Sequence, residues 1–244
     1  MLLRRVMKHV RDQNWFAVGI DFVIVVTGVF IGIQVANWNT ERQNRALADG
    51  YIERLHHEIV ELIDKGAEAV RANDEKNRLL WEVQTYLDAT GGEAPDLGPQ
   101  HCRAIVRSHI YARGIILPPT LSELLATGRV ALIDDEALRT SIASFAQSIN
   151  EIGQLRNDIQ IDRLPLARRY PQFITLSARA WDQSVCLFDQ MRHANDFRND
   201  LADNAYRFEA FAVNVLAEQL HLQQELHAHI DRRLNVDHES AATP

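Results

Sequence analysis

A long apolar run near the N-terminus dominates the pattern of hydrophobic and polar positions. Residues 15–37 contain one formal charge, Asp21; Trp15 begins the run and Trp38 follows it. As a helix with a rise of ~1.5 Å per residue, the run is about 34 Å long, enough to cross a hydrocarbon core of ~30 Å. Tryptophan favours the interfaces of a bilayer, so Trp15 and Trp38 are predicted interface anchors. The pattern predicts a transmembrane helix over residues 15–37.

Two other kinds of segment share this apolar character: the buried core helix of a soluble protein and a cleaved signal peptide. A core helix rarely stays apolar over such a length. The apolar region of a signal peptide spans about 7–15 residues and is followed by a cleavage site with small residues. Here the run is longer, and residues 35–38 read Val-Ala-Asn-Trp, a poor cleavage site. We therefore expect an uncleaved membrane span.

Beyond the span, apolar positions recur every three or four residues, which is the spacing of amphipathic helices. A helix is predicted from residue 39 to about 89, continuing the span as a stalk, followed by helices near residues 99–112, 120–127, 134–159 and 203–234. The chain has only 11 Gly and 7 Pro, too few for the many turns of a β-sandwich. The predicted fold is all-α: a transmembrane helix, a stalk helix and an extracytoplasmic helical bundle within residues 38–235, with a disordered tail at 236–244.

Several predicted helix ends rest on local signals. Thr120 and Glu123 have the spacing of a capping box, in which the side chain of each residue accepts a hydrogen bond from the backbone N–H of the other. Gly128 suits the left-handed position after a short helix. Asp134 is placed to cap the next helix, because its carboxylate can accept from the first free N–H groups.

Charge predicts the orientation of the span. Four basic residues precede it, Arg4, Arg5, Lys8 and Arg11, whereas three mixed with acidic residues follow it, Arg42, Arg45 and Arg54. Short segments rich in Lys and Arg stay in the cytoplasm. Residues 1–14 are therefore expected to be cytoplasmic, as a surface helix or as a frayed tail, and the C-terminal domain periplasmic in a bacterial inner membrane.

One side of the predicted span gathers its polar and small residues. At ~100° per residue, Gly28, Gly32 and Ala36 fall on the same side of the helix as Asp21. Small residues four apart let two membrane helices approach closely, and a carboxylate at membrane depth favours a protein partner. Asp21, Gly28, Gly32 and Ala36 therefore form a predicted association face. The alternative is that Asp21 reaches the cytoplasmic headgroups and the glycines are incidental.

The remaining candidate chemistry is sparse. Cys102 and Cys186 pair in a disulfide if the domain is in an oxidising compartment, or they are two buried thiols. Two ExxH pairs, Glu53 with His56 and Glu218 with His221, have the spacing of ligands in di-iron bundles. His and Glu are also common on solvated helix faces, so no metal, cofactor or catalytic residue is predicted. The chain also lacks the GxSxG, P-loop, HExxH and GxGxxG motifs.

Two stretches resemble a family of bacterial single-span membrane proteins whose function is uncharacterised. The first, residues 19–42, carries an acidic residue, an apolar run and a polar end, at Asp21, Gly28, Gln34, Asn37, Trp38 and Asn39. Asp21 stands where Glu is more usual, and Ala36 also departs from the pattern. The second, residues 120–142, is similar to the family's short helix, glycine turn and following helix. Together they cover about a fifth of the chain. The resemblance implies the fold and topology, and no activity.

These features favour an interaction or scaffold protein, which oligomerises or supports a membrane partner. The alternatives are a periplasmic sensory or ligand-binding accessory subunit and a metal-dependent enzyme that uses the ExxH pairs. The expected partners are the lipid bilayer and either further copies of the chain or another membrane protein. The net charge is −7 although the first residues are basic, so the domain is acidic and would repel nucleic acid.

Overall fold

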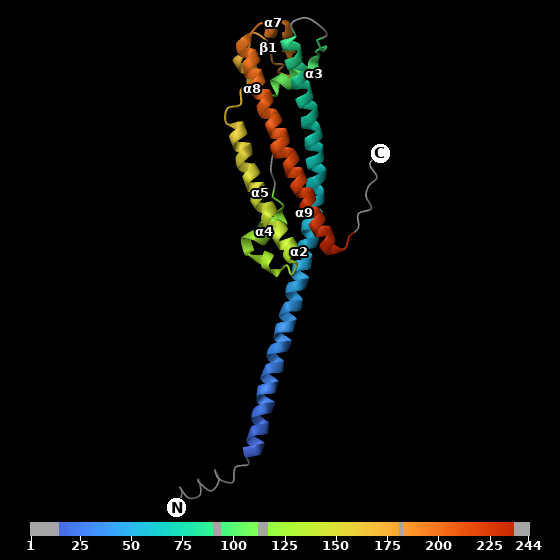
Figure 1. The fold of residues 1–244 in the computed structure, drawn as a ribbon, viewed down its shortest axis with the longest axis vertical. Coiled ribbons are helices and arrows are strands. Elements are labelled where there is room, and N and C mark those ends of the chain that lie inside the picture. The colour runs from blue at the N-terminus through green and yellow to red at the C-terminus, as the bar shows by residue number, and fades with distance from the viewer. Residues whose placement is uncertain (1–14, 90–93, 112–116, 181–182, 237–244) are drawn as a thin grey trace, which may run out of the picture. The chain divides into compact units, whose positions relative to one another are not determined.

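The computed structural model describes residues 15–89, 94–111, 117–180 and 183–236, without the side chains of residues 15–18 and 21. The predictions for residues 1–14 and 237–244 lie outside these residues, as do the side chains of Trp15 and Asp21. The described chain is all-α, with a long N-terminal helix that begins apolar and is followed by further helices (Figure 1). Its contacts divide into two units, Met1–Gly50 and Tyr51–Pro244.

The first unit contains the start of helix α2, which extends from Trp15 to Asp88. We call residues 22–37 of this helix the apolar segment. Its large side chains are exposed, for example Phe22 at 69% and Phe30 at 60%. The helix is long and apolar enough to cross a membrane, with a mean hydropathy of 1.6 over its most apolar 18 residues. A continuous apolar surface of this size is rare on a soluble protein and common on a helix in lipid.

The second unit is a helical bundle. We call residues 51–88 of α2, which belong to this unit, the domain segment. The elements that follow it are α3 (Pro99–Val106), α4 (Pro119–Thr127), the 3₁₀ turn η1 (Arg129–Leu132), α5 (Glu136–Gln160), α6 (Leu166–Arg169), α7 (Phe188–Arg192), α8 (Asn195–Phe211), the π-helical segment η3 (Ala212–Ala217) and α9 (Glu218–Leu234). The domain segment, α5 and α9 run alongside one another (Figure 1).

Short elements join the bundle at its two ends. Strands β1 (Ile174–Thr175) and β2 (Val185–Cys186) pair antiparallel, with Ile174 opposite Cys186. They lie with α3 and α7 near one end of the bundle, whereas α4 lies near the other (Figure 1). The main core cluster lies where α8 meets the domain segment and α3. Phe197, Phe208 and Phe211 are fully buried there, as are Leu80 and Val83.

Gly128 has the predicted left-handed conformation, with φ of 68°. Two capping predictions are wrong. The N-cap of α4 is Pro118, without a side-chain cap, because Thr120 and Glu123 bond to α2 instead of to each other. The N-cap of α5 is Asp135, one residue after the predicted Asp134, and it accepts from the backbone N–H of Leu138.

The predicted last helix begins too late. The structure starts α8 at Asn195, eight residues before the predicted start, and η3 and α9 then carry the helical path on to Leu234. Phe197 and Leu201, four residues apart and fully buried, are the apolar positions of the missed turns. The polar residues around them hid this spacing in the sequence.

Candidate functional site

The predicted association face on the apolar segment is open. Apart from the neighbouring turns of its own helix, a Cβ added at Gly28 or at Gly32 would meet no atom within 4 Å. The carbonyl of Ala36 accepts from the hydroxyl of Thr40 at 3.0 Å, and Trp38 is 65% exposed. The side chain of Asp21 lies outside the described residues. The face therefore has room for a second helix, and its role in association stays a prediction.

The two ExxH pairs do not form a common metal site within the described chain. Glu53 and Glu218 are both exposed. His221 is also exposed and pairs with Glu225 on its own helix at 3.4 Å. His56 is the exception, because it turns toward the last part of α9. In the described chain, the one group of three potential ligands close enough for a metal ion is His56, His227 and Asp231.

This three-residue group, the His–His–Asp cluster, joins α2 to α9. The Nε2 of His56 lies 3.0 Å from Oδ1 of Asp231, and the Nδ1 of His227 lies 3.2 Å from Oδ2 of the same carboxylate. The two imidazole rings are stacked with their centroids 5.0 Å apart. The three side chains are 14–19% exposed, so the cluster is shielded but accessible. Sequence reasoning found His56 and missed the other two, although their i, i+4 spacing on α9 was a signal.

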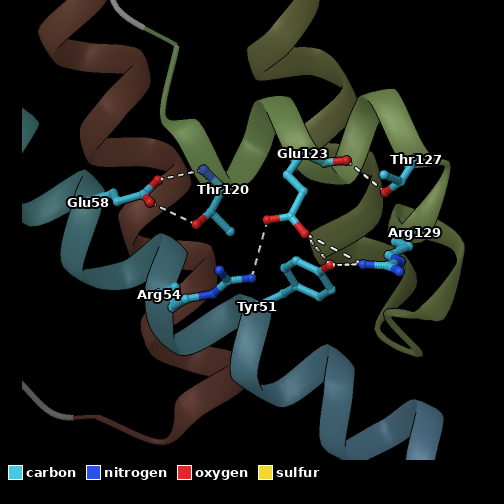
Figure 2. A network of polar contacts seen from close by, with 7 residues as sticks. All are labelled: Tyr51, Arg54, Glu58, Thr120, Glu123, Thr127 and Arg129. Carbon is cyan, nitrogen blue, oxygen red and sulfur yellow. Dashed lines mark hydrogen bonds and ion pairs between the residues drawn. The ribbon is translucent and has the colours of Figure 1, made fainter.

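A polar network joins α4 to the start of the domain segment (Figure 2). The hydroxyl of Tyr51 donates to Oε1 of Glu123 at 2.6 Å. Arg129 donates to that hydroxyl, and both Arg54 and Arg129 lie 3.5 Å from the Glu123 carboxylate. The hydrogen bond from Tyr51, reinforced by the two guanidinium groups, lowers the pKa of Glu123. These contacts hold α4 and η1 against α2, which is a structural role.

Glu58 completes the same junction from the next turn of α2. Its Oε2 accepts from the backbone N–H of Thr120 at 2.9 Å, and its Oε1 accepts from the Thr120 hydroxyl at 2.7 Å (Figure 2). The first N–H groups of a helix lack partners within the helix, and a negative charge there also suits the helix dipole. A carboxylate from α2 thus replaces the local cap that α4 lacks.

A disulfide joins Cys102 of α3 to Cys186 of β2, with Cα atoms 5.5 Å apart and a sequence separation of 84. The bond attaches the two-stranded β element to the core. Beside it, His101 is almost fully buried, and its Nε2 lies 2.8 Å from a carboxylate oxygen of Glu82 in the domain segment. The disulfide and this part-buried polar contact therefore both help to hold this end of the bundle together.

Among the described residues, Lys76 is the basic group whose pKa is shifted most strongly. Burial, with a smaller contribution from the positive charge of Arg107, lowers the pKa of Lys76 to about 7. Its ammonium donates to the carbonyl of Ile110 at 2.8 Å and lies 3.9 Å from the centre of the Phe208 ring. Beside it is a cavity of about 340 Å³, which Arg103, Arg107, Tyr111 and one acidic residue, Glu75, also line. A partly apolar cavity of this size with cationic groups is suited to a small anionic molecule.

Comparisons with protein-family models, with curated proteins and with solved structures find no match for this chain. The resemblance carried by residues 19–42 and 120–142 therefore stays a prediction, as does any function that follows from it.

Proposed function

We propose that the protein is a membrane-anchored helical interaction module, with its N-terminus in the cytoplasm and its bundle on the far side of the membrane. The observation that carries the proposal is the open face of the apolar segment, where a Cβ added at Gly28 or Gly32 has nothing within 4 Å beyond the neighbouring turns of its own helix. Membrane helices associate by close packing, because lipid chains are as apolar as leucine side chains. An exposed glycine face in an apolar helix is typical of such an interface.

Two observations support the proposed orientation. The residues before the apolar segment carry Arg4, Arg5, Lys8 and Arg11, which favour the cytoplasmic side. The Cys102–Cys186 disulfide favours an oxidising compartment such as the periplasm for the bundle. Reporters fused after Trp38 and at Pro244 test this: activity of both only outside the cytoplasm supports it, and a cytoplasmic signal at either position contradicts it.

Crosslinking of the full chain in native membranes tests the interaction role. Gly28→Leu and Gly32→Leu should each lower the yield of crosslinked species several-fold, because leucine separates the two backbones while it keeps the segment apolar. Val23→Leu is the matched control, because Val23 lies about 160° from Asp21 around the helix at ~100° per residue. Equal crosslinking yields in all three variants would show that the glycine face is not an interface.

A second role, a ligand-binding accessory subunit, is favoured by one observation, the cavity beside Lys76, Arg103 and Arg107. Titration of the purified chain with octanoate, and with 1-octanol as the uncharged control, tests it. Saturable binding of octanoate that Arg107→Gln weakens supports this role, and equal binding of both probes contradicts it.

A further inference from the structure

The His–His–Asp cluster has the donor set of a metal site. It offers two imidazole nitrogens and one carboxylate oxygen, and these three atoms all lie within 4.8 Å of one another. Imidazole and carboxylate ligands suit divalent first-row transition metals, and zinc often takes three protein ligands with water as the fourth. We propose that His56, His227 and Asp231 bind one divalent ion of this class, with Zn²⁺ as the representative, and thereby link α2 to α9.

The geometry already approaches that of a coordinated ion. Zinc binds nitrogen and carboxylate oxygen at about 2.0–2.2 Å, so two ligand atoms on the same ion lie roughly 3.3–3.6 Å apart in tetrahedral geometry. His56 lies 3.0 Å from one carboxylate oxygen of Asp231 and His227 lies 3.2 Å from the other, and both distances are slightly shorter than this separation. An ion therefore requires shifts of the two imidazole rings and the carboxylate that bring all three ligand atoms, now within 4.8 Å of one another, to this separation.

The protonation chemistry of the cluster is compatible with a metal ion. A carboxylate accepts only, so a ring nitrogen that hydrogen-bonds to Asp231 carries the proton of that bond. A metal ion takes the place of this proton, and in a neutral imidazole the proton is then carried by the other ring nitrogen. Both histidines can thus coordinate as neutral ligands, and Asp231 contributes the negative charge that offsets part of the charge of the ion.

Because the three ligands come from two helices, metal binding would affect the stability of the bundle. His227 and Asp231 are one turn apart on α9, a spacing that places both side chains on one face of the helix. His56 comes from α2, 175 positions away from Asp231 in the sequence. An ion bound by all three therefore joins helices that are distant in the chain. Binding to the folded state alone raises the apparent stability of the bundle as the free metal concentration increases.

α9 also provides a matched control. His221 and Glu225 have the same i, i+4 spacing, but their side chains are 59% and 58% exposed, and in the described chain no third ligand is close enough to complete a metal site with them. If any exposed His and acidic pair on this helix bound metal, the two pairs would behave alike. The proposal requires that they differ.

The experiment is calorimetric titration of Zn²⁺ into the full chain, purified in detergent without a histidine tag and treated with a chelator. We expect one ion per chain, binding at least tenfold weaker in His227→Gln and in His56→Gln, and unchanged binding in His221→Gln. Thermal melts without metal should show that all variants are folded. The melting temperature should rise with Zn²⁺ in the wild type and in His221→Gln only.

Substitution with Co²⁺ gives a second readout, because the visible absorption of cobalt reports its coordination. A tetrahedral-type spectrum that is lost in His56→Gln supports a site shared by α2 and α9. Equal Zn²⁺ affinity in His227→Gln and in the wild type would overturn the proposal, as would loss of binding in His221→Gln alone. Failure of the wild type to bind Zn²⁺ at millimolar concentration would also overturn it.

Discussion

The apolar segment and the domain segment belong to the same helix, α2, but their apolar side chains have opposite surroundings. From Phe22 to Val35 the large apolar side chains are 49–69% exposed, whereas the buried ones between Tyr51 and Leu87 are 0–6% exposed. A helical backbone is thus compatible with either environment. The domain segment depends on protein packing, and the apolar segment, under the proposed function, depends on lipid. Substitutions in the two regions should therefore change different measurable properties.

The largest expected effect is the loss of the disulfide, which lies in the bundle. Closing the loop between Cys102 and Cys186 stabilises by roughly 4–5 kcal/mol in the chain-entropy model, as an upper estimate. Cys102→Ser combined with Cys186→Ser should lower the free energy of unfolding by up to that amount in urea titrations of the full chain. Membrane retention of the variant should not change. A variant with wild-type stability would show that the bond contributes little to the bundle.

Truncation of a buried side chain tests directly whether the two segments contribute differently to the stability of the bundle. Leu80 is fully buried, so Leu80→Ala should destabilise the bundle by about 2–5 kcal/mol. Ile24→Ala, in the apolar segment where Ile24 is 62% exposed, should leave the urea midpoint of the bundle unchanged. If both substitutions shifted the midpoint equally, the energetic distinction between the two segments would be lost.

Lys76 should make the stability of the bundle depend on pH. Burial lowers the pKa of Lys76 to about 7, so the folded state binds this proton less tightly than the unfolded state does. This group therefore disfavours folding below pH 7, and stability is regained as the pH rises from 7 toward the unfolded pKa of about 10.4. Between pH 7 and 9 the wild type should gain about 2 kcal/mol relative to Lys76→Met. Parallel stability profiles of the two proteins would contradict the burial of a charged ammonium.

The smallest effect concerns the junction of α4 with α2. Glu58→Ala removes both hydrogen bonds to Thr120 and should cost about 0.5–2 kcal/mol, the range for a lost helix cap. Glu53→Ala, an exposed change on the same helix, should stay within about 0.5 kcal/mol of the wild type. Urea titration of the two variants measures the difference, and equal values would show that Glu58 does not act as a cap.

Periodic apolar positions predicted the long helices because burial repeats with the helical turn. Leu138, Ile142 and Phe145 recur three or four residues apart within the helix predicted at residues 134–159, and all three are buried in α5. The start of α8 was missed because Phe197 and Leu201 are its only large apolar residues before Asp203, among several charged neighbours. One turn of apolar spacing is too little evidence to predict a helix. The helix starts earlier because other parts of the fold bury these two side chains.

The polar sites were harder to predict, because their partners are distant in the sequence. Thr120 and Glu123 have the local spacing of a capping box, but Glu58 and Tyr51 compete for them from α2. Similarly, the ExxH spacing identified His56 but pointed to His221 instead of His227. The correct partner depends on the register between α2 and α9, which local spacing does not contain.

The cap supplied by Glu58 has a consequence for the order of folding. An isolated nine-residue helix such as α4 is marginal in water, and this one has no side-chain cap of its own. The acceptor for its Thr120 N–H is 62 residues earlier in the chain. We therefore expect α4 to form late, after α2 is in place. Its amide hydrogens should then exchange with solvent only when the whole junction opens, in a single cooperative step.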